Sequence, residues 1–562
     1  MSPRLRCIPL GGLGEIGRNM MVLEYDRDIV IIDVGVMFPE NEMLGVDLVI
    51  PDVSYLLDKL DRIRGIIITH GHEDHTGSLP YVLPQLGFPP VWATTLTAGL
   101  ISVKLKEHRL TDRVSMNTIS PGKEVRFGAL RAEFFRVCHS IPDGVGVALH
   151  TPAGLVVHTG DFKFDYTPVD RRQTDFAQLA ALGARGVLCL FSDSTHADQP
   201  GYTPSERVVG EALDGYFAAA RGRIIVTTFA SLISRIQQVI DTAARYDRRV
   251  GIIGRSMVQN VNIAQELGYL TAPPGVLLKA EDLGQLKQLP PNQVVLITTG
   301  SQGEPTSALT RMANRDHRQI EIVPGDTVIM SAGSIPGNEE LVHRTIDNLF
   351  RLGANVLWGH ATNVHVSGHA SQEELKLMLS LVRPKYFVPV HGEYRHLILH
   401  ARIAQGLGIP AQNIFVIEDG EVLELTADRG EVTEHVSAGY VFVDGLGVGD
   451  VGQVVLRDRQ ALAQDGILIV TITVDRHTGL PIAGPDIVSR GFVYVRENEE
   501  LVDKARAQVQ LALRSSPAVS GDNEARQVDW QYVKNKIRDV LSKFVYEQTR
   551  RRPMILPLVM EV

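Results

Sequence analysis

The feature that most constrains this chain is a dense run of metal-binding residue types within residues 67–77. Directly after an isoleucine-rich run that predicts a β-strand come, within six positions, His70, His72, Asp74 and His75. Imidazole and carboxylate groups suit a borderline ion such as Zn²⁺, and the alternating spacing would let two ions share the loop. Chance does not explain such a cluster, because the chain has only 18 His among 562 residues. A metal site is therefore predicted here.

Three further candidate ligands, His139, Asp161 and Asp33, each follow another short run of β-branched and aromatic residues. A catalytic metal site gathers side chains from several strand ends at one rim of a sheet, so these positions suit additional ligands. Considered singly, each has a simpler interpretation. A histidine at a strand end is usually structural, and an aspartate before glycine usually stabilises a turn.

Composition favours a large enzyme without a membrane span. A chain of 562 residues predicts about three or four domains, and no apolar run reaches the roughly 20 residues of a membrane helix. The N-terminal residues lack the apolar core of a secretory signal, and the three cysteines are too scattered for a disulfide framework, so we expect a cytoplasmic protein. The net charge of −9 argues against a general nucleic-acid binder, although a local basic groove can dominate the field near a site.

One glycine pattern predicts less than it first suggests. Gly12, Gly14 and Gly17 have the spacing of a dinucleotide-binding loop, which must lead into a helix. Residues 18–25 have the composition of a strand instead, so we do not expect NAD binding. We expect these glycines to let the backbone turn tightly beside the metal loop.

The middle of the chain predicts a parallel α/β domain inserted after a turn-rich stretch at 198–204. Loops that lead into helices bind anions well, so those at 228–231, 300–303 and 332–339 are candidate phosphate sites, although helix capping is their commoner role. The predicted strands, each followed by a polar or glycine-rich loop and helix-like sequence, are residues 223–227, 250–253, 294–298 and 327–331.

In chain order, these motifs resemble those of the metallo-β-lactamase superfamily. Asp193 and His391, each after an apolar run, and His369, after Ser-Gly, resemble the motifs of its β-CASP group, which processes nucleic acids. Nearly the whole chain resembles the ribonuclease J family, including segments outside catalysis at 445–452 and 552–557.

The resemblance implies an α/β fold: a metallo-β-lactamase αββα sandwich, an inserted parallel α/β β-CASP domain and a small C-terminal α/β domain. The expected boundaries are 1–205 and 358–426 for the two parts of the sandwich, 206–357 for the β-CASP domain, 427–463 for a linker and 464–562 for the C-terminal domain.

The resemblance also implies two divalent ions, Zn²⁺ or Mn²⁺ or both. Asp33 would touch neither ion and would orient the ligands through hydrogen bonds. The implied ligands are His70, His72 and His139 for one ion, Asp74, His75 and His391 for the other, and Asp161 between them.

The implied catalytic residues are His369, Asp193 and Asp74. His369, held by Asp193, would protonate the leaving oxygen or stabilise the transition state. Without the resemblance, His369 could cap the helix predicted from residue 372, and Asp193 could accept a hydrogen bond within its own turn.

Substrate contacts are implied as well. His365, Ser367 and Gly368 resemble a pocket for a 5′-terminal monophosphate, and Phe38 resembles an aromatic on which the terminal base stacks, with core packing as its alternative. Other candidate contacts are Ser234, Gly333, Ser334 and Asn338. An extra structural cation could be held by Asp47, Asp52 and Asp444, although exposed turn aspartates are the better explanation.

The implied activity is cleavage of single-stranded RNA in decay and maturation, by a 5′-to-3′ exonuclease that prefers 5′-monophosphate ends and has additional endonuclease activity. The alternatives are a small-molecule metallo-hydrolase of the lactonase or thioesterase type and a β-CASP DNA nuclease; a noncatalytic RNA-binding scaffold is disfavoured because every expected ligand is present. A small-molecule enzyme rarely needs an inserted domain of about 150 residues. The resemblance also implies a homodimer, or a tetramer, through the C-terminal region.

Overall fold

The computed structural model describes residues 4–562 except 336, 477–479, 494–498, 516–518 and 521–526. The chain divides into two compact units, Met1–Phe38 with Leu48–Val441 and Pro39–Asp47 with Phe442–Val562. Among the described helices, none combines the length and the apolar character that a membrane span requires.

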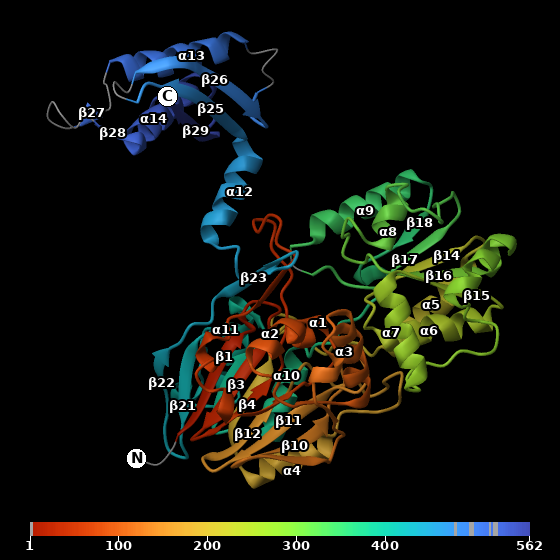
Figure 1. The fold of residues 1–562 in the computed structure, drawn as a ribbon. Coiled ribbons are helices and arrows are strands. Elements are labelled where there is room, and N and C mark those ends of the chain that lie inside the picture. Colours follow the sequence, from red (N-terminus) through yellow and green to blue (C-terminus); the bar gives the residue numbers. More distant parts are fainter. Residues whose placement is uncertain (1–3, 336, 477–479, 494–498, 516–518, 521–526) are drawn as a thin grey trace. The chain divides into compact units, whose positions relative to one another are not determined.

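The first unit is built on two sheets that pack face to face (Figure 1). Leu23 of one sheet and Phe134 and Val156 of the other belong to the core between them. The eight-stranded sheet has the order β22 (Gly430–His435), β21 (Glu421–Leu425), β1 (Leu5–Gly11), β3 (Met20–Tyr25), β4 (Asp28–Ile32), β6 (Ile63–Ile67), β7 (Val91–Ala93), β8 (Met116–Thr118). The six-stranded sheet has the order β19 (Tyr386–Val390), β13 (Val187–Asp193), β12 (Gly154–His158), β11 (Val145–Thr151), β10 (Leu130–Arg136), β9 (Glu124–Phe127).

Helices cover the outer face of each sheet and complete the predicted αββα sandwich. α2 (Leu79–Gln85) and α3 (Thr95–Glu107) share a buried apolar cluster with the eight-stranded sheet. α4 (Phe176–Arg185), α10 (Gln372–Val382) and α11 (Tyr394–Gly406) do the same for the six-stranded sheet. The sequence pattern fits, because α4 buries Leu179 and Leu182, three residues apart on one helix face.

The inserted domain is a five-stranded, fully parallel sheet (Figure 1). Its order is β15 (Arg249–Ile253), β16 (Val294–Thr298), β14 (Ile224–Thr227), β17 (Thr327–Met330), β18 (Asn355–Leu357). α5 (Arg207–Ala219), α6 (Ile233–Arg245) and α7 (Arg255–Glu266) join one apolar cluster, whereas α8 (Ala308–Ala313) and α9 (Glu339–Arg351) join another. The four predicted strands are confirmed, and β18 adds a fifth.

The second unit contains a small α/β domain. Its sheet has the order β26 (Pro481–Arg490), β25 (Ile467–Val474), β29 (Met554–Glu561). α13 (Glu499–Arg514) and α14 (Trp530–Thr549) share its buried core.

The stretch expected to be a linker, 427–463, is more structured than its composition suggests. β22 pairs antiparallel with β21 and is the edge strand of the eight-stranded sheet, so the sandwich extends past residue 426. α12 (Gln453–Asp465) is a regular helix in the second unit. The other expected boundaries, at 205, 357 and 463, remain predictions.

Candidate active site

Polar residues from six strand ends meet at one edge of the sandwich. β4, β6, β12, β13 and β19 make parallel pairs within the two sheets, which brings their carboxyl ends to a common edge. Asp33 after β4 and His391 after β19 have φ of 62° and 54°, a region that non-glycine residues rarely adopt. Such strain persists where surrounding contacts over-determine it, as is common at functional sites.

One group of donor atoms combines three imidazoles with Asp161. His72 Nδ1 lies 3.0 Å from His70 Nε2 and 3.1 Å from His139 Nε2. Asp161 Oδ2 lies 3.6 Å from His70 Nε2 and 3.7 Å from His139 Nε2. Burial lowers the pKa of His72 to about 4, so this imidazole is neutral at neutral pH, the form that binds metal.

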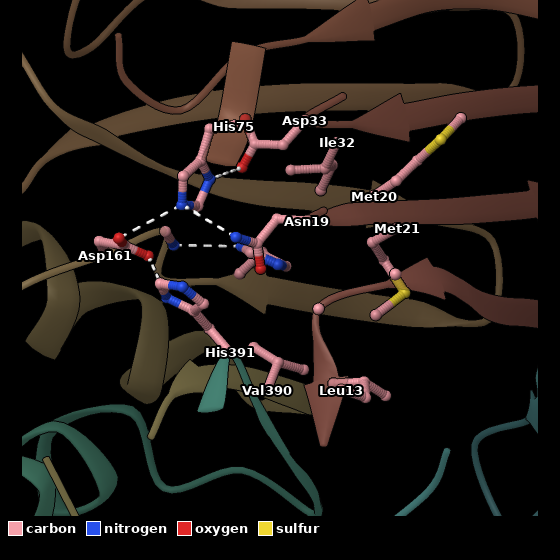
Figure 2. A pocket seen from close by; sticks show the side chains of 14 residues that line it. Leu13, Asn19, Met20, Met21, Ile32, Asp33, His75, Asp161, Val390 and His391 are labelled. Atoms are coloured by element: carbon pink, nitrogen blue, oxygen red, sulfur yellow. Dashed lines mark hydrogen bonds and ion pairs between the residues drawn. The ribbon is translucent and has the colours of Figure 1, made fainter. Parts of the chain in front are cut away.

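A second group combines Asp74, His75, Asp161 and His391. His75 Nε2 lies 3.2 Å from Asp161 Oδ2, and His391 Nδ1 lies 2.8 Å from Asp161 Oδ1 (Figure 2). His75 Nε2 also lies 3.6 Å from Asp74 Oδ2. Burial opposes protonation of His391, but the carboxylate of Asp161 outweighs it and raises the pKa to about 10. The carboxylates therefore favour a positive charge here, which a proton or a metal cation can supply.

Asp161 belongs to both groups and links them. Its Oδ2 is buried and makes no hydrogen bond within the described chain. A buried carboxylate oxygen without a hydrogen bond is costly, and a cation held among the surrounding imidazoles would compensate it. The donor set of neutral imidazoles and carboxylates therefore fits divalent metal ions.

Neighbouring groups fix the direction of the imidazoles. Asp33 Oδ2 accepts from His75 Nδ1 at 2.8 Å and from Thr69 Oγ1 at 2.8 Å, while its Oδ1 accepts from Thr69 N at 2.8 Å (Figure 2). His139 Nδ1 donates to the carbonyl of Gly368 at 2.7 Å. In both histidines the Nδ1 proton is held away from the cluster, which leaves Nε2 free to bind metal.

His369 and Asp193 lie at the border of these groups. His369 Nδ1 is 2.8 Å from Asp193 Oδ2, and Asp161 Oδ2 is 4.0 Å from the same nitrogen. Asp193 Oδ1 accepts from the backbone and hydroxyl of Thr195 at 3.0 and 2.8 Å, so its orientation is fixed. Burial alone would lower the pKa of His369, but Asp193 raises it above the usual value.

The structure brings most of the expected substrate contacts close to this edge. A Cβ added at Gly333 would lie 3.3 Å from His365 Nε2, so the loop after β17 meets the segment before α10. Ser367 Oγ accepts from His369 N at 3.1 Å, and Ser234 lines a cavity that His139 also lines.

The remaining expected contacts lie at the surface. Phe38 has half its surface exposed, which excludes core packing as its role. Ser334 is exposed in the loop after β17, and Asn338 occupies the N-cap of α9 without a side-chain capping bond.

Asn19 was not identified from the sequence, and Gln302 was identified only as part of a candidate phosphate loop. Asn19 Nδ2 donates to the carbonyl of Asp74 at 3.0 Å and lies 3.2 Å from His75 Nε2 (Figure 2). Gln302 is buried and bridges the loop after β17, donating to Gly333 O and accepting from Ile335 N, each at 2.7 Å. Asn19 follows the glycine-rich turn expected beside the metal loop, which is the only signal for it; Gln302 lies in a predicted phosphate loop.

The extra structural cation remains a prediction, and its three expected ligands have other partners in this structure. Asp47 Oδ2 accepts from Gly445 N at 2.8 Å, Asp52 Oδ1 accepts from Ser54 N at 2.9 Å, and Asp444 pairs with Arg459 at 2.5 Å. In the part of the chain that the structure describes, none of these carboxylates joins a group of metal donors. Turn hydrogen bonds and one guanidinium already satisfy them.

Family models cover much of the chain. They are the metallo-beta-lactamase superfamily (residues 13–176), the ribonuclease J beta-CASP domain (221–349), the Zn-dependent metallo-hydrolase RNA specificity domain (359–414) and the ribonuclease J C-terminal domain (454–562). The sandwich is therefore a metallo-β-lactamase domain and the insert a β-CASP domain.

Relatives match from end to end. Ribonuclease J2 of Bacillus subtilis is 45% identical over 100% of this chain and 99% of its own. Ribonuclease J 1 of Streptococcus pyogenes is 45% identical over 98% of this chain and 96% of its own. A solved protein of unknown function from Enterococcus faecalis shares the fold, with a TM-score of 0.52 and 14% identity over 75% of this chain and 100% of its own. The chain belongs to the ribonuclease J family.

Proposed function

We propose that this protein is a two-metal ribonuclease that degrades and matures RNA, as the names of its relatives suggest. The observation that carries the proposal is the position of Asp161, a buried carboxylate that belongs to every group of metal donors in the described chain and whose Oδ2 makes no hydrogen bond there. His70, His72 and His139 would hold one ion, and Asp74, His75 and His391 the other. Zn²⁺ and Mn²⁺ both suit these ligands. Bound ions would activate water and neutralise charge on the phosphate.

The residues themselves supply proton transfer. The bond from Asp193 orients His369 and favours its protonated form, and its side chain is partly exposed. A protonated imidazole at this position can donate a proton to the leaving oxygen of a cleaved phosphodiester.

We infer that RNA is degraded from a 5′-monophosphate end, with additional internal cleavage. Gly333 and His365 lie close together beside Ser367, which supports a pocket for a terminal phosphate. A pocket of directed donors would leave the extra charge of a triphosphate unpaired. The exposed ring of Phe38 is available to stack on a terminal base.

Initial rates on otherwise identical RNAs with monophosphate, triphosphate and hydroxyl 5′ ends test this proposal. The protein should be stripped with a chelator and reloaded with Zn²⁺ or Mn²⁺. We expect cleavage only after reloading, and mononucleotide release fastest from the monophosphate. Replacing Ser367 with a bulky residue should weaken that preference. Equal exonucleolytic rates on all three ends would exclude a terminal-phosphate pocket, and cleavage without metal would exclude the metal mechanism.

The alternatives have less support. A lactonase or thioesterase has no use for the domain that matches the RNA specificity model, and a DNA nuclease is not suggested by any of the relatives named here. A scaffold without activity would not retain a complete donor set. Cleavage of DNA at the rate of RNA would favour the DNA nuclease.

We propose that the chain forms a homodimer, or a tetramer, through its C-terminal domain. One face of the sheet β26-β25-β29 is covered by α13 and α14, while the other exposes a row of apolar side chains: Ile482, Val488, Leu556, Leu558 and Met560. Exposed apolar patches of this kind mark interaction sites.

The three cysteines are free and buried, which supports a reducing compartment such as the cytoplasm.

A further inference from the structure

Three charged side chains are buried where the chain passes between the sandwich and the inserted domain. Lys163, Glu206 and Arg235, which we call the buried triad, are 0%, 5% and 1% exposed. Lys163 follows the ligand-bearing end of β12, Glu206 directly precedes α5, and Arg235 lies on α6. The triad therefore joins elements of both domains.

The triad is held together by charge. Arg235 Nη2 lies 2.5 Å from Glu206 Oε2, and Lys163 Nζ lies 3.7 Å from Glu206 Oε1. Asp165 accepts a hydrogen bond from Glu206 N at 3.0 Å. Its carboxylate also lies 4.0 Å from Lys163 Nζ and balances the charge of this second cation. Burial opposes ionisation of Glu206, but Arg235 and Lys163 lower its pKa, so the group stays charged. Because an unpaired buried charge is very costly, these residues restrict the junction to one arrangement.

The cations also hold the backbone of residues 364–369. Arg235 Nη1 donates to the carbonyl of Val364 at 2.9 Å, and Lys163 Nζ donates to that of Ser367 at 3.0 Å. The next two carbonyls accept from His139 and from Thr203. With these carbonyls engaged, the backbone N–H groups of Ser367 and Gly368 make no hydrogen bond within the described part of the chain. Ser367 is half-buried and Gly368 is buried, and both N–H groups keep their hydrogen-bonding capacity for a ligand.

We propose that the buried triad is a positioning device for the 5′ end of RNA. By fixing the carbonyls of Val364 and Ser367, it preforms the amide groups of Ser367 and Gly368 as donors to a terminal phosphate. Preformed donors need no rearrangement on binding, which increases both affinity and selectivity. This inference rests on the proposed function, because it assigns the end preference of that enzyme to residues that touch neither metal nor RNA.

The variant Glu206→Gln tests the triad, because it keeps the shape of the side chain and removes the charge between the two cations. The measured quantities are kcat/KM on 5′-monophosphate RNA, on the same RNA with a 5′-hydroxyl, and on a circular form that has no end. We expect the monophosphate-to-hydroxyl ratio to fall by roughly tenfold to a hundredfold, the scale of loss from a small misplacement of binding groups. Internal cleavage of the circle should fall less, and bound metal should stay at the wild-type content.

Matched controls lie on α5 and α6. Arg207 and Glu211 form an exposed pair on α5, so Glu211→Gln makes the same chemical change without touching the triad. If Glu206→Gln does not fold, Arg235→Lys replaces it, since lysine keeps the charge but cannot reach Val364, Ser331 and Glu206 together. Its control is Arg245→Lys on the exposed side of α6.

The outcomes separate the two proposals. A wild-type protein that cleaves no RNA overturns the proposed function, and with it the role of the triad. A wild-type end preference that Glu206→Gln leaves intact overturns the triad alone. A parallel loss on all three substrates would make the triad purely structural and would also overturn the inference.

Discussion

His72 is the residue whose removal most directly tests metal binding. Its Nδ1 contacts Nε2 of both His70 and His139, so His72→Ala removes one of the three imidazoles of the first donor group. The loop should keep its shape, because Asp33 holds Thr69 and His75 independently of His72. We expect metal content and RNA cleavage to be lost and thermal unfolding of the metal-free protein to change little. Elemental analysis, cleavage assays and calorimetry measure these effects.

A matched control for that variant is His150→Ala. His150 lies on β11 and contacts Glu133 at 3.1 Å, so it is also a half-buried histidine beside a carboxylate, but among the described residues it belongs to no donor group. It should retain metal and activity. Full activity and normal metal content in His72→Ala would contradict the ligand assignment.

His369 tests the chemistry apart from the metal. We expect His369→Ala to keep its metal and its RNA affinity and to lose turnover by about 10² to 10⁴, the usual contribution of a general acid. Asp193→Asn should also change turnover, because Asp193 favours the protonated form of His369. Because Asp193 raises the pKa of His369, its removal lowers that pKa, and the protonated donor is lost at lower pH. The alkaline limb of the kcat–pH profile should therefore move to lower pH, while an unshifted profile would contradict a proton held by this pair.

Residue identities at the site could be predicted because metal chemistry restricts them to a few types at strand ends. Every expected ligand, from His70 to His391, lies in one of the donor groups. Asn19 could not be predicted, since an amide after a glycine-rich turn has many uses and only the folded chain brings it to His75. The turn aspartates show the limit of residue type alone: Asp47 and Asp444 suit a cation site, but in the folded chain Gly445 N and Arg459 contact their oxygens.

At the level of elements, a buried charged cluster ties the glycine-rich turn to the end of the sandwich. Arg18 donates to Glu15 and Asp419 at 2.8 and 3.0 Å and to the carbonyl of Gly439 at 2.9 Å. In the same turn, the carbonyl of Gly12 accepts a hydrogen bond from the backbone N–H of His391 at 3.0 Å. The carboxylates of Glu15 and Asp419 therefore share the guanidinium of Arg18, close to the turn that holds the backbone of His391.

This cluster predicts a pH-dependent stability. Burial and the charge of Glu15 raise the pKa of Asp419 to about 7, whereas an aspartate in the unfolded chain titrates near 3.9. The unfolded chain therefore loses this proton first, and stability falls between about pH 4 and pH 7. Asp419→Asn leaves Arg18 paired with Glu15 alone, so we expect weaker pH dependence in that window and a higher unfolding temperature above pH 7. Calorimetry of both proteins from pH 5 to 8 measures the difference, and parallel curves would contradict it.

Elements with strong periodicity were predictable, and those defined by tertiary pairing were not. The runs at 294–298 and 386–390 became β16 and β19 because β-branched and aromatic residues favour buried strands. The edge strand β22 is mostly exposed and polar, so its composition resembles a linker; its pairing with β21 defines it. α12 buries only Leu456, which leaves little apolar periodicity to detect.

For the whole molecule, the net charge of −9 does not prevent RNA binding, because the proposed contacts are local: metal ions, amide groups and an exposed aromatic ring. Association of two copies depends on a different surface. The sheet β26-β25-β29 exposes apolar side chains on β26 and β29, and a symmetric dimer would bury them against its own copy.

Leu558→Asp tests this interface. Leu558 is exposed near the centre of the row on β29, and burying a leucine contributes about 1.5 to 3 kcal/mol. A twofold interface contains each substitution twice, so the free energy of association loses at least about 3 kcal/mol. This loss weakens dimerisation by more than about 100-fold. Leu511→Asp is the control, because Leu511 is exposed on α13, on the opposite side of the domain. Light scattering during size-exclusion chromatography should find Leu558→Asp monomeric and the control dimeric. Dimers of both variants would place the interface elsewhere, and monomers of the wild type would exclude the dimer.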